Sequence, residues 1–146
     1  ADVTGVQTCA LPIYTDKFNY SDINEGICMS KVVIVARKNK LDALLHAMNG
    51  IGVTGVTITD VTGYGVQKGN KNSYYRSEDE DLTLLPKVKI EIIVSTVPVA
   101  KVVATAEKIL YSGNYGDGKI FIYDVRDAVK VRTGKTGMEA LVDESN

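Results

Sequence analysis

Residues 112–125 read SGNYGDGKIFIYDV, a glycine-rich loop followed directly by a β-branched and aromatic run. Three glycines within six residues allow positive φ angles and let several backbone N–H groups face one concavity, and Lys119 adds a positive charge beside it. This pattern predicts phosphate binding. The alternative is a turn after a helix with Gly113 as the cap, which would explain the first glycine but not the further pair and the lysine.

The loop also has the G-x-x-x-x-G-K spacing of a P-loop, in which a Ser or Thr and then a helix follow the lysine. Here Ile120 follows instead, and residues 120–125 predict a strand. The pattern therefore lacks both the hydroxyl that holds Mg²⁺ and the helix dipole. We expect a phosphate site without the P-loop hydrolase fold.

Length and charge set limits on the fold and the partners. The chain has 146 residues, the size of one domain, and no run reaches the roughly 18 consecutive apolar residues of a membrane helix. Residues 29–146 carry 16 basic and 14 acidic side chains, a net charge of +2, so nucleic-acid binding is not expected. Cys9 and Cys28 lie outside the patterned region and define neither a disulfide framework nor a metal site, so a reducing compartment is the simplest interpretation.

Residues 1–28 have no helix or strand period and none of the features of a targeting signal. Residues 3–13 resemble, position for position, the in-frame translation of a common sequencing-library adapter. We interpret residues 1–28 as an assembly artefact with the natural start at Met29, and a disordered natural extension is the alternative. The coding DNA would distinguish the two. The predicted domain is residues 29–146.

From Met29 onward, hydrophobic periodicity predicts two β-α-β halves. Residues 32–36 are typical of a buried strand, residues 41–51 of an amphipathic helix, and residues 53–64 of a strand that ends at Gly63 and Gly65. A long loop is expected over residues 65–86, with its polar stretch at 68–81. The second half comprises a strand at 88–94, a helix with Pro98 in its first turn and its end at Gly113, and a strand at 120–125. Residues 128–134 predict a short extended piece, and residues 134–146 a mobile tail.

This order predicts an α+β, ferredoxin-like βαβ-βαβ sandwich with a long loop between its second and third strands. Right-handed crossovers would place both helices on one face of a four-stranded sheet. The other face, rich in valine and isoleucine, would need a cover. We therefore expect oligomerisation through that face.

Four motifs resemble those of the PII signal-transduction family, in the family's order and nearly its spacing, over residues 31–141. They are GYGVQKG at 63–69, LPKVKIE at 85–91, the glycine loop and strand start at 113–121, and VRTG at 131–134. The resemblance implies a ferredoxin-like homotrimer with ATP or ADP in the clefts between subunits. It also implies sensing of 2-oxoglutarate and control of nitrogen metabolism by protein contact rather than by enzymatic catalysis, with slow ATP hydrolysis at most incidental.

The resemblance assigns residues to the ligands motif by motif. In the family, the glycine loop cradles the phosphates, a neighbouring subunit supplies basic side chains, and the base of the long loop lines the nucleotide. The positions so matched to ATP are Thr57, Gly63, Tyr64, Gly65, Gln67, Glu91, Gly116, Asp117, Gly118, Lys119, Lys130 and Arg132. Those matched to 2-oxoglutarate are Gln67, Lys68 and Lys87, with Gln67 also at the Mg²⁺ ion.

Several positions depart from the family pattern. Val66 replaces a basic residue, and Lys130 stands where many members have the first of two arginines, although lysine cannot make a bidentate contact with phosphate. Glu80 falls where many bacterial members carry a uridylylated tyrosine, and Ser77 lies near a position phosphorylated in cyanobacterial relatives. The sequence therefore predicts no covalent switch.

The GlnK-like branch of the family is the best match. Tyr75 and Arg76 match a tyrosine-arginine pair at the apex of the long loop, where Arg76 would plug the cytoplasmic vestibule of an ammonium transporter. The protein would then be cytoplasmic and recruited to the inner face of the membrane by that transporter. A nitrogen transcriptional regulator or the glutamine synthetase system are the other partners that the resemblance implies.

Two readings from other classes stay open. A nucleotide-hydrolysing enzyme would need a positioned base, and the candidates Asp117 and Asp124 have no second partner identifiable from sequence. A metal-binding trimer of similar fold would need a His/Cys cluster, and the sequence has none.

Overall fold

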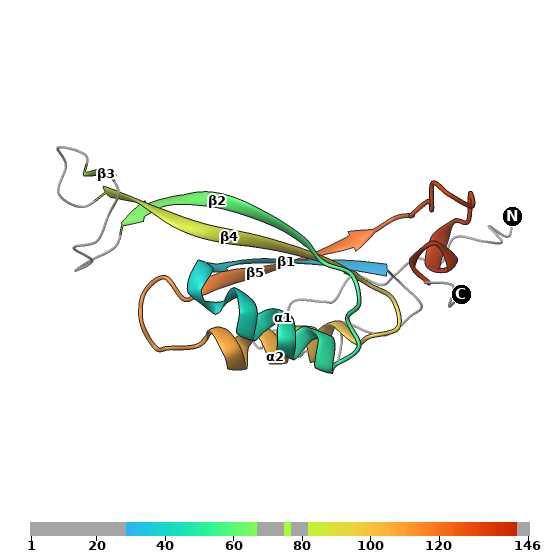
Figure 1. Ribbon diagram of the computed structural model, residues 1–146, viewed down its shortest axis with the longest axis horizontal. Coiled ribbons are helices and arrows are strands. Elements are labelled where there is room, and N and C mark those ends of the chain that lie inside the picture. The colour runs from blue at the N-terminus through green and yellow to red at the C-terminus, as the bar shows by residue number, and fades with distance from the viewer. Residues whose placement is uncertain (1–28, 67–74, 77–81, 143–146) are drawn as a thin grey trace, which may run out of the picture.

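The computed structural model describes residues 29–66, 75–76 and 82–142. Four strands form an antiparallel sheet in the order β2-β4-β1-β5, with bounds β1 Met29–Arg37, β2 Thr57–Val66, β4 Leu82–Val94 and β5 Gly118–Val125. Helices α1 (Leu41–Gly50) and α2 (Val99–Leu110) lie side by side on one face of this sheet (Figure 1). The predicted ferredoxin-like α+β fold is confirmed.

The core lies between the sheet and the two helices. Alternate side chains of β1 and β4 point toward the helices, and Ile34, Ile90 and Ile92 among them are fully buried. Leu44 of α1 and Val102 of α2 cover them, in keeping with the apolar spacing of both helices. Burial of each such side chain stabilises the fold by about 1.5–3 kcal/mol, so this layer determines which face of every strand is inside.

The second face of the sheet, which we call the open face, is not covered by either helix (Figure 1). Strand register places Phe121, Val33, Glu91 and Thr57 in one row across it, because each pairs with the next on the neighbouring strand. Phe121 is 44% exposed and Tyr123 is 54% exposed. Exposed aromatic side chains grouped on one face are typical of an interaction surface.

Strands β2 and β4 continue beyond the sheet as a two-stranded arm (Figure 1). The predicted end of the strand at Gly63 and Gly65 is wrong, because an unbroken ladder to Val66 provides cross-strand hydrogen bonds that outweigh the low strand preference of glycine. The predicted start at residue 53 is also wrong, since pairing begins at Thr57. Pro86 is tolerated within β4 because β1 pairs only as far as Lys87.

The long loop is described only in part. Strand β3 (Tyr75–Arg76) pairs with Leu84 and Thr83 of β4, so the predicted structureless stretch contains at least this pairing. The rest of residues 68–81 lies outside the described residues. The arm therefore displaces the tyrosine-arginine pair from the core of the domain.

Three predicted details near the C-terminus are corrected. Helix α2 ends at Leu110 with Tyr111 extended, so Gly113 is not its cap. Pro98 directly precedes the first turn of α2 and does not lie within it as predicted. Residues 128–134 are not extended. The carbonyl oxygen of Lys130 accepts a hydrogen bond from Gly134 N at 2.8 Å, in a turn closed by the bridge between Val129 and Thr136. Within the predicted tail, Gly137–Leu141 forms the short 3₁₀ helix η3. A further 3₁₀ turn, η2 (Lys38–Lys40), joins β1 to α1.

Candidate ligand site at the glycine loop

The glycine loop, residues 111–117, connects α2 to β5 and lies against the end of β1. Strand pairing begins directly after the loop, with Gly118 opposite Ala36 and Lys119 opposite Val35. Gly118 has φ +125°, and a Cβ there would lie 2.3 Å from the carbonyl oxygen of Val35. Only glycine permits this close approach, so Gly118 fixes where the loop meets the sheet.

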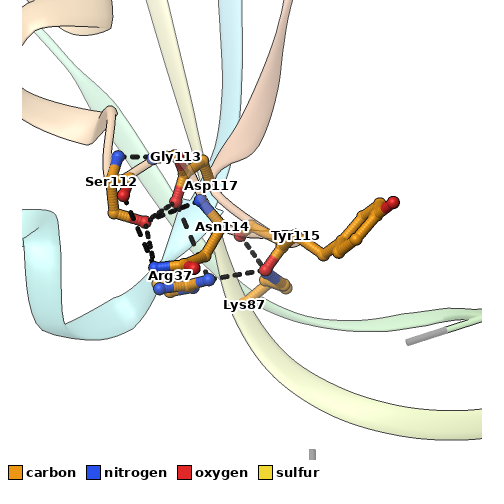
Figure 2. A network of polar contacts seen from close by, with 8 residues as sticks. Arg37, Lys87, Ser112, Gly113, Asn114, Tyr115 and Asp117 are labelled. Carbon is orange, nitrogen blue, oxygen red and sulfur yellow. Dashed lines mark hydrogen bonds and ion pairs between the residues drawn. The ribbon is translucent and has the colours of Figure 1, made fainter. Parts of the chain in front are cut away.

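The carboxylate of Asp117 folds back onto the start of the loop (Figure 2). Its Oδ2 accepts hydrogen bonds from Ser112 N at 2.7 Å and Gly113 N at 3.1 Å, and its Oδ1 accepts one from Ser112 Oγ. The hydrogen bond from the Ser112 hydroxyl, with those from the two backbone N–H groups and the charge of Arg37, lowers the pKa of Asp117. The carboxylate is therefore ionised at neutral pH and closes residues 112–117 into a ring.

Two cations hold the other side of the loop. Arg37 and Lys87 are register partners on β1 and β4. Arg37 Nη2 donates to Tyr115 O at 2.6 Å and lies 3.7 Å from Asp117 Oδ1, while Lys87 Nζ donates to Gly116 O at 2.7 Å. Figure 2 shows both basic side chains beside the loop and the ring of Tyr115 pointing away from them.

The surroundings of Lys87 suit an anion. Partial burial, and then the charge of Arg37, lower the pKa of Lys87, while Asp117 opposes the shift. The stem of Lys87 crosses Gly63, where a Cβ would lie 3.3 Å from Lys87 Cγ. A partly desolvated amine next to a guanidinium gains more from an anionic ligand than a surface lysine does.

Most of the site residues predicted on the strands share the open face of the sheet. Thr57 and Glu91 are register partners, Lys119 lies in the next row, and Lys87 with Arg37 in the row after that. Gly63 follows Lys87 along the arm. The rows thus form a continuous strip from the middle of the open face to the glycine loop.

Glu91 is held within this strip by two lysines. Its Oε1 lies 2.5 Å from Lys31 Nζ, and its Oε2 lies 3.4 Å from Lys89 Nζ. The hydrogen bond from Lys31 is the main cause of a lowered pKa for Glu91. Glu91 is therefore an ionised acceptor at a fixed position next to Thr57.

Other predicted positions are not brought to the strip by this chain. Tyr64 alternates onto the opposite face of β2 and is 66% exposed. Lys130 and Arg132 follow the far end of β5, opposite the end at which the glycine loop enters, and Lys130 Nζ donates to Val142 O at 2.6 Å. Gln67 and Lys68 lie outside the described residues, as do Ser77 and Glu80.

Sequence reasoning missed Arg37 and Ser112. Arg37 ends an apolar strand and Ser112 precedes the first loop glycine, but neither position has a motif that marks its contact with Asp117 or Tyr115. Within the part of the chain that the structure describes, no group of three or more His, Cys, Asp or Glu side chains is placed to hold a metal ion. None of the described helices is both long and apolar enough to span a membrane.

Comparison with known proteins identifies the family. The sequence profile described as Nitrogen regulatory protein P-II matches residues 29–135. The chain belongs to the P-II family. The Nitrogen regulatory protein P-II of Rhizobium etli is 42% identical over 113 residues, which are 77% of this chain and 100% of the relative. The Nitrogen regulatory PII-like protein of Bacillus subtilis is also 42% identical over 113 residues, 77% of this chain and 97% of its own.

Solved structures agree with this membership. The Bacillus subtilis GlnK-ATP complex superposes with a TM-score of 0.67 at 38% identity and covers 79% of this chain and 99% of its own. Arabidopsis thaliana PII bound to citrate has a TM-score of 0.65 at 34% identity and covers 82% of this chain and 98% of its own. This P-II chain therefore resembles relatives whose structures contain a nucleotide or a polycarboxylate.

Proposed function

We propose that this P-II protein is a GlnK-like nitrogen signalling protein that binds ATP or ADP at the glycine loop and 2-oxoglutarate beside Lys87. The observation that carries the proposal is the strip on the open face, in which Thr57, Glu91, Lys119 and Lys87 lie in consecutive rows ending at the loop. Likeness to the GlnK-ATP complex supports ATP as the ligand class.

The residues of the strip have different tasks in this proposal. Thr57 and Glu91 offer polar acceptors for the adenosine end, and Lys119 with the backbone of residues 116–118 holds the phosphates. By their match to the family motif, Gly63, Tyr64, Gly65 and Gln67 would line the base of the long loop at the nucleotide. Mg²⁺ would offset phosphate charge, with Gln67 supplying an amide oxygen, the kind of ligand that hard cations accept.

The dicarboxylate is expected where Lys87 and Arg37 lie side by side. A carboxylate there would replace the carbonyl oxygen of Gly116 as the acceptor for Lys87, so its binding would loosen the loop. Lys68 would add a third positive charge for the dicarboxylate. The citrate carried by the Arabidopsis relative is also a polycarboxylate, which supports this ligand class.

Assembly as a homotrimer would complete the site. Lys130 and Arg132 are remote from the glycine loop of their own chain, so they would contact a phosphate bound by a neighbouring copy. The exposed aromatic residues Phe121 and Tyr123 on the open face are a surface that such an assembly would cover.

Output would come from the tip of the arm. Tyr75 and Arg76 lie there in β3, and we propose Arg76 as the residue that enters an ammonium transporter, which would recruit this cytoplasmic protein to the inner face of the membrane. Ligands at the base of the arm would shift the population of arm conformations. A nitrogen transcriptional regulator or the glutamine synthetase system are further proposed targets.

Calorimetric titration with ATP tests the nucleotide site. Lys119→Ala removes a charge-assisted contact worth about 1.5–3 kcal/mol, which is a loss of about 10- to 150-fold in affinity. The matched control is Lys108→Ala, an exposed lysine on α2 far from the strip, which should bind like the wild type. An unchanged affinity for Lys119→Ala would contradict the assignment of the phosphate site.

A further inference from the structure

Asp117 is the one acidic side chain in a loop that is proposed to hold phosphates. A carboxylate that faced a phosphate would repel it. In the structure both oxygens are already engaged, Oδ2 by Ser112 N and Gly113 N, and Oδ1 by Ser112 Oγ and the nearby guanidinium of Arg37. The carboxylate therefore faces the interior of its own loop.

Hydrogen bonds from Arg37 and Lys87 set the direction of two peptide units in the loop. The carbonyl oxygen of Tyr115 points at Arg37 and that of Gly116 points at Lys87. In a trans peptide the N–H is opposite the C=O, so the N–H groups of Gly116 and Asp117 point away from both cations. No hydrogen bond from the Gly116 N–H is recorded among the described residues, whereas residues 115–116 form a turn in which the Asp117 N–H faces Asn114 O. The Gly116 N–H is therefore a backbone donor from which an anion at the loop can accept a hydrogen bond.

We propose that Asp117 is a positioning residue for the glycine loop, acting through Ser112 and Arg37, and not a ligand of the phosphates or of a metal ion. Its carboxylate closes residues 112–117 into a ring, and Arg37 ties that ring to the end of β1. The ring holds the backbone N–H groups in place before the anion arrives. The inference rests on the proposed nucleotide site and specifies how that site is built.

Three variants separate positioning from direct binding. Asp117→Asn keeps the shape but weakens the contacts to Ser112. Ser112→Ala removes an exposed hydroxyl that donates to Asp117 and also accepts long contacts from Asn114 N and Nδ2, both at 3.4 Å. The third is the double variant. The matched control is Asp124→Asn, which removes one exposed negative charge from β5 outside the loop. Each protein is titrated with ATP in Mg²⁺ and again in excess EDTA.

Positioning predicts four results. Both single variants lose about 3- to 10-fold in ATP affinity, the range for one net hydrogen bond. The double variant loses less than the sum of the two single losses, because both changes remove the contact between Asp117 and Ser112. The loss is equal in Mg²⁺ and in EDTA. In the unliganded variants, amide hydrogen exchange of residues 112–113 becomes faster, while Asp124→Asn matches the wild type.

Other outcomes overturn the inference. A loss for Asp117→Asn that occurs only in Mg²⁺ would make Asp117 a metal ligand. Additive losses, or unchanged affinity in both single variants, would show that the ring does not prepare the site. If Lys119→Ala weakens binding while these variants do not, only the inference fails. If the wild type binds no ATP, the proposed function fails with it.

Discussion

Gly118→Ala tests the claim that the glycine loop is fixed by its close approach to β1. The new Cβ would lie 2.3 Å from the carbonyl oxygen of Val35 and 3.2 Å from the Cα of Ala36, both backbone atoms near the end of the inner strand β1. A positive φ costs an alanine about 1–2 kcal/mol, and displacement of packed backbone costs about a further 1–3 kcal/mol. We expect a loss of about 2–5 kcal/mol from a total stability of about 5–15 kcal/mol.

The measurement is urea unfolding followed by circular dichroism, at one fixed protein concentration. The matched control is Gly134→Ala, at φ +71° with no atom within 4 Å of the new Cβ, which should lose only the conformational part, about 1–2 kcal/mol. Equal losses for the two variants would refute the steric reasoning. The remaining soluble Gly118→Ala protein should also bind ATP more weakly, since the loop and Lys119 would shift together.

Further predictions address the ligands and the output. Lys87→Met keeps the stem that crosses Gly63 but removes the charge, so calorimetry should show loss of the 2-oxoglutarate response with most ATP binding retained. Lys101→Met on α2 is the control. A loss of ATP affinity as large as that of Lys119→Ala would contradict the division of roles. The pKa of Asp117 is lowered in the folded protein, so its stabilising contribution is present above the unfolded-state pKa of about 3.9 and disappears as pH falls through the lower folded-state pKa. The stability difference between wild type and Asp117→Asn, measured by urea unfolding, should therefore be present at about pH 6–7 and shrink as the pH falls below about 3.9, and a constant difference would count against the shift. Arg76→Ala should abolish co-sedimentation with membranes that contain the cognate ammonium transporter while ATP binding is unchanged, and full membrane binding would rule out Arg76 as the inserting residue.

Local periodicity predicts the elements that bury one face. The helix at residues 41–51 and the strand at 32–36 follow apolar spacing that the core requires, and the structure has α1 and β1 there. Residues 53–56 resemble β2 in their valine, threonine and glycine content but pair with no residue of β4. Composition cannot show where a ladder begins, so the start of β2 was predicted wrongly.

The glycine loop and Lys119 are evident from local sequence, and the four motifs identify the family. The side-chain contacts that hold the loop in place could not be predicted from local sequence. Arg37, Lys87 and Asp117 belong to separate strands or loops, and only the register of β4 and β5 against β1 brings them together. Register depends on the whole hydrophobic layer, so a local pattern does not predict it.

The most direct test of the central claim is a calorimetric titration of 2-oxoglutarate into this protein loaded with ATP and Mg²⁺, compared with the same titration without nucleotide. The account predicts saturable binding to the loaded wild type, because the proposed dicarboxylate site at Lys87 and Arg37 adjoins the proposed phosphate site, and it predicts loss of that binding in Lys87→Met. Absence of binding to the loaded wild type, or equal binding by Lys87→Met, would contradict it.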